Sequence, residues 1–140
     1  MDSSRDRLFF DTNWTSPTLL SLAAHIGAPG LIRFGGTGND ALYYGLGGAP
    51  PCGPTIDGKY ECLNETLWDG LQALSAASSA PLIFGVNIHP ASSGESPPKA
   101  AFNATNARAL LLHAKARAQP LFGLELGNEQ NTQMDAAEPV

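Results

Sequence analysis

The sequence predicts an α/β fold built on parallel strands. Three short apolar segments, at 31–34, 82–86 and 121–126, have the length and composition of buried strands. Helical patterns precede and separate them, so the predicted order is α-β-α-β-α-β, which favours βαβ units and a parallel sheet. Polar, glycine-containing segments follow the strands, at the edge of the sheet where α/β proteins place their active sites.

Each predicted helix has recognisable start, stop or packing signals. The first begins at Ser16-Pro17, with serine as N-cap and proline as the first helical residue, and is ended by Gly27. The second, at 66–77, carries leucines on one face, and the third, at 105–118, is ended by Pro120. Four residues of the third helix are expected to point inward, namely Ala107, Leu110, Leu111 and Ala114.

The remaining segments complete one folded unit. Residues 45–59 and 90–99 are rich in glycine, proline or serine and are predicted to be loops. We expect residues 1–131 to form a single unit and residues 132–140 to be a loose polar tail.

Composition and charge exclude several classes of protein. The chain has 140 residues, of which 43% are hydrophobic, and this is enough for one core. Its net charge of −5 argues against nucleic-acid binding, which usually needs a basic surface. No apolar run approaches the roughly 20 residues of a membrane-spanning helix, and residues 1–7 are too polar for a signal peptide. His25, His89 and His113 have no metal-ligand spacing, so we expect no metal and no cofactor, with His25 and His113 on helix surfaces.

Three Asn-x-Thr sequons are candidate glycosylation sites, at Asn13, Asn64 and Asn103. Asn64 and Asn103 fit equally well as helix N-caps. Cys52 and Cys62 flank a short loop and are a candidate disulfide in an oxidising compartment, with free buried thiols as the alternative.

A glycine-rich segment follows the first predicted strand. Gly35-Gly36-Thr37-Gly38 lacks the lysine of a Walker loop and the spacing of a dinucleotide site, so its glycines are expected to let the backbone turn tightly. This turn would leave Thr37, Asn39 and Asp40 free to face a ligand. Within the strand, Arg33 is expected to pair with Glu125 in the interior.

The segment 124–131, Leu-Glu-Leu-Gly-Asn-Glu-Gln-Asn, ends the last strand with an Asn-Glu pair. A carboxylic acid such as Glu129 can protonate a glycosidic oxygen while the adjacent amide of Asn128 holds a sugar hydroxyl. The alternative is a solvated loop glutamate. Glu125 is a poor second carboxylate, because on an extended strand it lies roughly 13 Å from Glu129, whereas a retaining glycosidase needs about 5 Å and an inverting one about 6.5–9.5 Å. A sharp turn at Gly127 would shorten this distance.

Four segments, at 33–40, 63–69, 82–87 and 124–131, resemble the heparanase-like enzymes of glycoside hydrolase family 79 in order and rough spacing. The resemblance implies a partial (β/α)8 (TIM) barrel, roughly units one to four. It also implies a retaining enzyme that cleaves β-glucuronidic bonds in glycosaminoglycan-like or other uronate glycans. Gln130 departs from the family, which has proline at this position.

The same resemblance assigns roles to individual residues. Glu129 matches the acid/base, Asn128 the adjacent substrate-binding amide and Thr37 a residue at the sugar site. The family's first strand and nucleophilic glutamate have no counterpart here, so we expect a fragment that is inactive alone and whose partner is the missing part of its own barrel. An extracellular, lysosomal or membrane-associated location is implied.

Two alternatives remain at this point. One is a truncated glycan-binding module without catalysis. The other is a different barrel glycosidase, such as a cellulase or arabinofuranosidase, which also ends its fourth strand in Asn-Glu but fits the Arg33–Thr37 segment less well.

Overall fold

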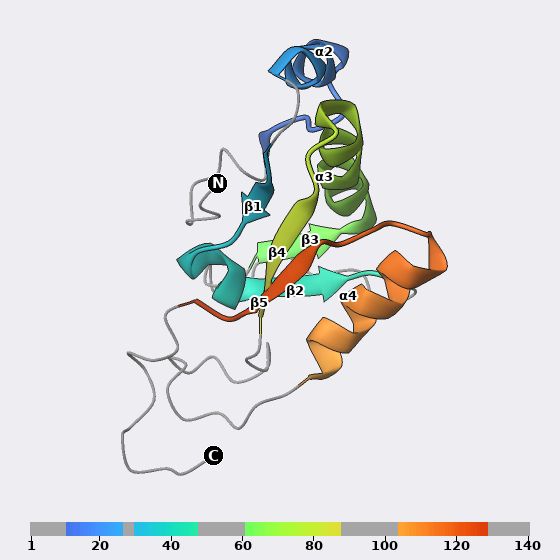
Figure 1. The fold of residues 1–140 in the computed structure, drawn as a ribbon. Coiled ribbons are helices and arrows are strands. Elements are labelled where there is room, and N and C mark those ends of the chain that lie inside the picture. The colour runs from blue at the N-terminus through green and yellow to red at the C-terminus, as the bar shows by residue number, and fades with distance from the viewer. Residues whose placement is uncertain (1–10, 27–29, 48–60, 88–103, 129–140) are drawn as a thin grey trace.

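A computed structural model describes residues 11–26, 30–47, 61–87 and 104–128 (Figure 1). These residues form an α/β structure with parallel strands, as predicted. In chain order the elements are α2 (Pro17–Ile26), β1 (Ile32–Phe34), the 3-10 helix η1 (Thr37–Ala41), β2 (Leu42–Gly45), β3 (Glu61–Asn64), α3 (Glu65–Ser78), β4 (Leu82–Val86), α4 (Thr105–Ala116) and β5 (Gly123–Leu126).

The main sheet has three parallel strands in the order β1-β4-β5. Arg33 of β1 pairs with Ile83 of β4, and Gly85 of β4 pairs with Glu125 of β5. Helices α3 and α4 lie between successive strands of this sheet in the chain, and Figure 1 places both to the right of the strands. Adjacent parallel strands joined through helices are the repeating unit of a (β/α)8 barrel, and the arrangement is consistent with part of one.

A second, two-stranded parallel sheet was not predicted from the sequence. Strand β2 pairs with β3 in the register Leu42↔Glu61 to Gly45↔Asn64. Leu42 and Tyr44 are completely or almost completely buried, so β2 has the period-two alternation of a strand. At four residues each, the two strands are too short to stand out beside the loop predicted at 45–59.

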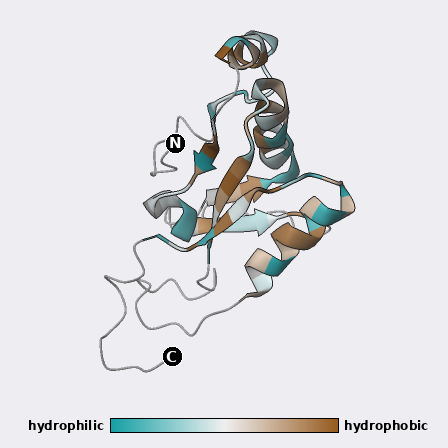
Figure 2. Cartoon of the chain, in the orientation of Figure 1, coloured by the Kyte–Doolittle hydropathy of each residue, from teal (hydrophilic) through white to brown (hydrophobic). Residues whose placement is uncertain are grey.

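The core lies between the strands and the helices. Figure 2 shows the central strand β4 as mostly hydrophobic. Phe34 of β1 meets the ring of Trp14 edge to face, with 5.5 Å between ring centroids, and Phe84 of β4 meets Trp68 of α3 in the same way at 5.3 Å. Aromatic pairs prefer this edge-to-face geometry, which stabilises the fold beyond the burial of apolar area alone. The aromatic rings therefore fix α3 and the 12–15 segment against the sheet.

The helices agree with the predicted ones to within two residues at each end. Helix α2 begins at Pro17, α3 covers 65–78, and α4 ends at Ala116 rather than at residue 118. None of the helices within the described ranges is both long and apolar enough to cross a membrane.

Two predictions about α4 were wrong. Leu111 is 39% exposed rather than inward-facing, whereas His113 is only 6% exposed rather than on the surface. Leu110 and Ala114 are buried as predicted. His113 lies on the same face of the helix, because it is three residues after Leu110 and directly before Ala114.

The outer edge of β5 carries exposed apolar side chains. Leu124 pairs with Phe84 and Leu126 with Val86, so both leucines belong to the face of the sheet that packs on helices elsewhere. They are nevertheless 40% and 65% exposed, and Phe122 just before the strand is 67% exposed. No described strand pairs with this edge.

We predict that Gly70→Ala destabilises the fold. A Cβ at this position of α3 would lie 2.7 Å from Cβ of Trp14, which is the root of the indole side chain and cannot swing away. Overpacking costs about 1–3 kcal/mol, and the better helix propensity of alanine returns only about 1 kcal/mol. The free energy of unfolding, measured by denaturant titration, should fall by up to about 2 kcal/mol. Gly30→Ala is the matched control, because its Cβ meets nothing within 4 Å; equal effects of the two variants would contradict the prediction.

Candidate active site

An ion pair crosses the face of the sheet opposite the helices. Nε of Arg33 donates to Oε1 and Oε2 of Glu125, at 2.8 and 2.9 Å, which confirms the predicted partnership. The two residues come from the outer strands β1 and β5, so the pair spans β4. Both side chains are more than a third exposed, and such pairs stabilise proteins by at most about 1 kcal/mol. The pair thus aligns the three strands more than it stabilises them.

Two glycines make room at the carboxyl end of this face. A Cβ on Gly35 would lie 2.7 Å from Oε2 of Glu125, and a Cβ on Gly85 would lie 2.9 Å from Nδ2 of Asn39. Gly36 then has φ 101° and ψ −178°, a conformation open in practice to glycine alone. The chain can therefore turn sharply after β1 and return across the end of the sheet as η1.

Asn39 anchors η1 to the ends of two strands. Its side chain is 1% exposed, and Nδ2 donates to the backbone oxygens of Phe34, at 3.4 Å, and of Gly85. The expectation that Asn39 would be free to face a ligand was wrong. A buried amide needs hydrogen-bond partners, and here the two carbonyl oxygens at the strand ends accept from it.

Asp40 links the same loop to the end of β5. Its Oδ1 and Oδ2 accept from the backbone N–H of Asn128, at 3.0 and 3.2 Å. Asp40 is therefore also not free, contrary to prediction. The contact brings together two predicted site segments: the loop in which Thr37 begins η1, and the residue Asn128. Glu129 lies outside the described residues.

Asn87 and Tyr44 form a buried polar contact at the end of β4, which the sequence analysis missed. Nδ2 of Asn87 donates to the oxygen of Leu42, and its backbone N–H donates to Oη of Tyr44, both at 2.8 Å. Burial raises the pKa of the Tyr44 phenol well above its usual value; the Asn87 N–H opposes this, and the charge of Asp40 adds to it. The available signal was a polar residue directly after the apolar strand 82–86.

The other predicted residues lie away from this edge or outside the described ranges. Asn64 is the N-cap of α3, and Asn13 precedes α2. Cys62 lies in β3 and is disulfide-bonded. Cys52 and Asn103 lie outside the described residues, so the Cys52–Cys62 pair and the third sequon stay predictions. Within the described ranges, His, Cys, Asp and Glu side chains form no group of three or more that could hold a metal ion.

Parallel strands that bring polar loops together at their carboxyl ends define the class of α/β enzymes with an active site at that edge. The sequence matches the family described as glycosyl hydrolase family 79, N-terminal domain, over residues 12–138. The chain therefore belongs to this family of glycosidases, as the resemblance implied. Comparison with curated proteins gave no match.

We predict that Asp40→Ala loosens the end of β5. Removing the carboxylate leaves the Asn128 N–H without its acceptor, and a half-buried hydrogen bond to a charged group contributes about 1–2 kcal/mol. Hydrogen exchange at the Asn128 amide should become faster and the free energy of unfolding should fall by that amount. Asp40→Asn keeps one acceptor oxygen and is the control. If Asp40→Ala left this amide as protected as in the wild type, the contact would not hold the strand end.

Tyr44 gives a prediction at alkaline pH. Because its pKa is raised in the folded protein, the neutral phenol contributes stability that is fully present below pH ~10, the unfolded value, and is lost as the pH rises above it. Between pH ~9 and ~11 the free energy of unfolding should therefore fall less steeply in Tyr44→Phe than in the wild type. Tyr43→Phe, at the preceding position of β2, is the matched control. An unchanged alkaline slope in Tyr44→Phe would rule out this contribution.

Proposed function

We propose that these residues belong to a retaining glycoside hydrolase that cleaves β-glucuronidic bonds in glycosaminoglycan-like or other uronate-containing glycans. The proposal combines membership of family 79 with the resemblance of four segments to its heparanase-like members. The observation that supports it is the hydrogen bond from Asn128 N–H to Asp40, because it holds Asn128, the residue that precedes Glu129 in the sequence, at the same sheet edge as the η1 loop. An active site assembled from several strand ends needs this proximity.

In the proposed mechanism Glu129 acts as the general acid/base. Its carboxylic acid protonates the glycosidic oxygen as the bond to the sugar breaks, and the resulting carboxylate then takes a proton from the water that releases the sugar. Asn128 donates a hydrogen bond to a sugar hydroxyl beside the bond that is cleaved. Thr37 contributes a further contact from the loop after β1.

We propose that the second carboxylate comes from another part of the barrel. Glu125 is bound to Arg33 and lies four residues before Glu129 along the chain. We propose that another strand of the barrel supplies the nucleophile, and that the 140 residues alone do not turn over substrate.

The proposed location is an extracellular or lysosomal compartment. Cys62 is disulfide-bonded, and disulfides persist in such oxidising environments. Family membership supports the same location.

The test of the proposed reaction is Glu129→Gln in protein expressed from the complete natural transcript. Glutamine cannot donate the proton, so kcat on a β-glucuronide with a poor leaving group should fall about 10²–10⁴-fold. The same variant should form its glycosyl-enzyme readily from a dinitrophenyl β-glucuronide, whose leaving group needs no protonation, and added azide should then speed turnover.

The matched control is Glu138→Gln, outside the Asn-Glu motif, which should keep wild-type kcat. Equal losses on the good and poor leaving groups would show that Glu129 is not the proton donor. Absence of hydrolysis of any β-glucuronide by the wild type would remove the proposed substrate class.

A further inference from the structure

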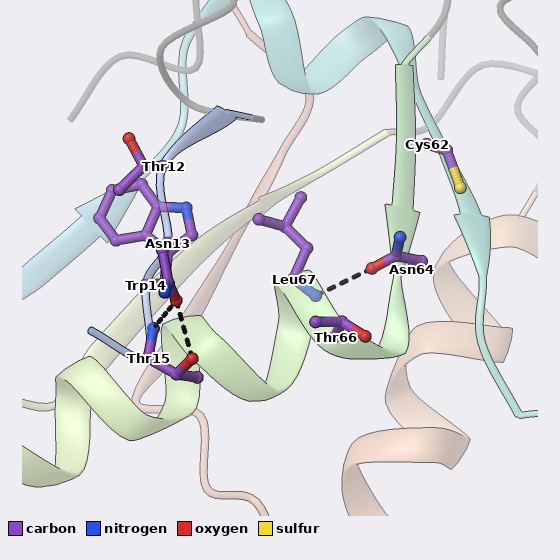
Figure 3. A pocket seen from close by; sticks show the side chains of 8 residues that line it. All are labelled: Thr12, Asn13, Trp14, Thr15, Cys62, Asn64, Thr66 and Leu67. Atoms are coloured by element: carbon purple, nitrogen blue, oxygen red, sulfur yellow. Dashed lines mark hydrogen bonds between the residues drawn. The ribbon is translucent and has the colours of Figure 1, made fainter. Parts of the chain in front are cut away.

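Two sequons that are far apart in the chain meet at one hollow on the helix side of the sheet. A pocket of about 300 Å³ lies between the 12–15 segment and the start of α3 (Figure 3). Six of its lining residues belong to the two sequons or directly follow one of them, namely Asn13, Trp14, Thr15, Asn64, Thr66 and Leu67. The hollow differs from the edge that carries Asn128, because none of its lining residues belongs to β1, η1, β4 or β5.

Asn64 can cap a helix and carry a glycan at the same time. Its Oδ1 accepts from the backbone N–H of Leu67 at 2.9 Å, which makes it the N-cap of α3. The cap uses the amide oxygen, whereas an N-linked glycan is attached to the amide nitrogen. Figure 3 shows that nitrogen on the side turned away from Leu67, and the residue is exposed. The N-cap and glycosylation interpretations of Asn64 are therefore compatible.

In Asn13, as in Asn64, the amide oxygen accepts hydrogen bonds from a residue nearby in the chain. Its Oδ1 accepts from both the backbone N–H and the hydroxyl of Thr15, at 3.1 and 2.8 Å, so the oxygen is again engaged within the sequon. Thr15 is exposed, while the middle residue Trp14 is buried against Phe34 and fixes the segment to the core. The sequon is thus held at the surface in a defined conformation.

Two independent observations favour modification over coincidence. Cys62 also lines the hollow and is disulfide-bonded, and disulfides persist in the oxidising compartments where N-glycans are added. The chain has 8 asparagines and 18 serines and threonines among 140 residues, so chance gives about one sequon rather than the three present.

We propose that Asn13 and Asn64 are N-glycan attachment sites, and that the first sugars lie over the hollow between them. The hydroxyls of Thr15 and Thr66 give this surface polar edges, and Trp14 and Leu67 give it an apolar side, which suits an N-acetylhexosamine ring. At about 300 Å³ the hollow is at the small end of ligand pockets, with room for single sugars rather than a chain. The proposal does not depend on the proposed hydrolase activity.

The test uses the full natural protein secreted from a eukaryotic host. Enzymatic deglycosylation in H₂¹⁸O converts each modified asparagine to a labelled aspartate, and trypsin then places the three sequons on separate peptides, 8–33, 60–99 and 100–108. We expect the label on 8–33 and 60–99. An unlabelled Asn13 or Asn64 peptide from a molecule labelled elsewhere would overturn the proposal for that residue, and hydrolase activity has no influence on this result.

Variants separate the modification from the cap. Thr66→Ala removes the sequon and keeps the cap oxygen of Asn64, Thr66→Ser keeps both, and Asn64→Asp keeps a cap oxygen but has no amide to modify. Peptide 60–99 should carry the label in Thr66→Ser and in neither of the others.

The position of the sugars is tested by trimming. Protein cut back to the first N-acetylglucosamine should melt at a higher temperature than fully deglycosylated protein, in which residue 64 is an aspartate that still caps α3. Identical melting temperatures would show that the first sugars do not contact the hollow.

Discussion

The candidate site depends on the absence of a side chain at Gly85. This glycine lies at the centre of the three-stranded sheet, and a Cβ there would meet the Asn39 amide at 2.9 Å and Cα of Gly35 at 3.2 Å. The open space lets the amide of Asn39 reach the ends of β1 and β4. Because η1 is fixed in this way, Asp40 can bond the end of β5. One missing methyl group thus decides where two loops lie.

Two buried amides, together with the carboxylate of Asp40, hold the loop ends. Asn39 and Asn87 are both fully or nearly fully buried, and each donates to a backbone oxygen of a neighbouring segment. Hydrogen bonds of buried amides do not compete with water, and they hold the segments that they join in a single arrangement. Thr37 and Asn128 remain the proposed contacts to substrate. The residues that hold this edge of the sheet in place are therefore different from those proposed to bind the sugar.

Sequence patterns predicted the elements that are long or strongly apolar, and they missed those defined by tertiary contacts. Strand β4 and helix α3 were predicted almost to the residue, and Arg33 was paired correctly with Glu125. Strands β2 and β3 were missed because four residues carry too little periodicity. The burial of His113 depends on how α4 packs, and the hydrogen bonds of Asn39 and Asp40 depend on the space at Gly85. Neither can be predicted from the residues that neighbour them in the sequence.

The exposed leucines and the unpartnered edge of β5 favour self-association of this part of the molecule. Leu124 and Leu126 stand on a strand whose outer backbone edge has no partner among the described strands. Exposed apolar side chains beside a strand edge that no described strand pairs with are a template for intermolecular pairing. A neighbouring element that completes this side must bring both a hydrogen-bonding backbone and apolar side chains. Without one, concentrated preparations of these residues will tend toward soluble oligomers and loss on surfaces.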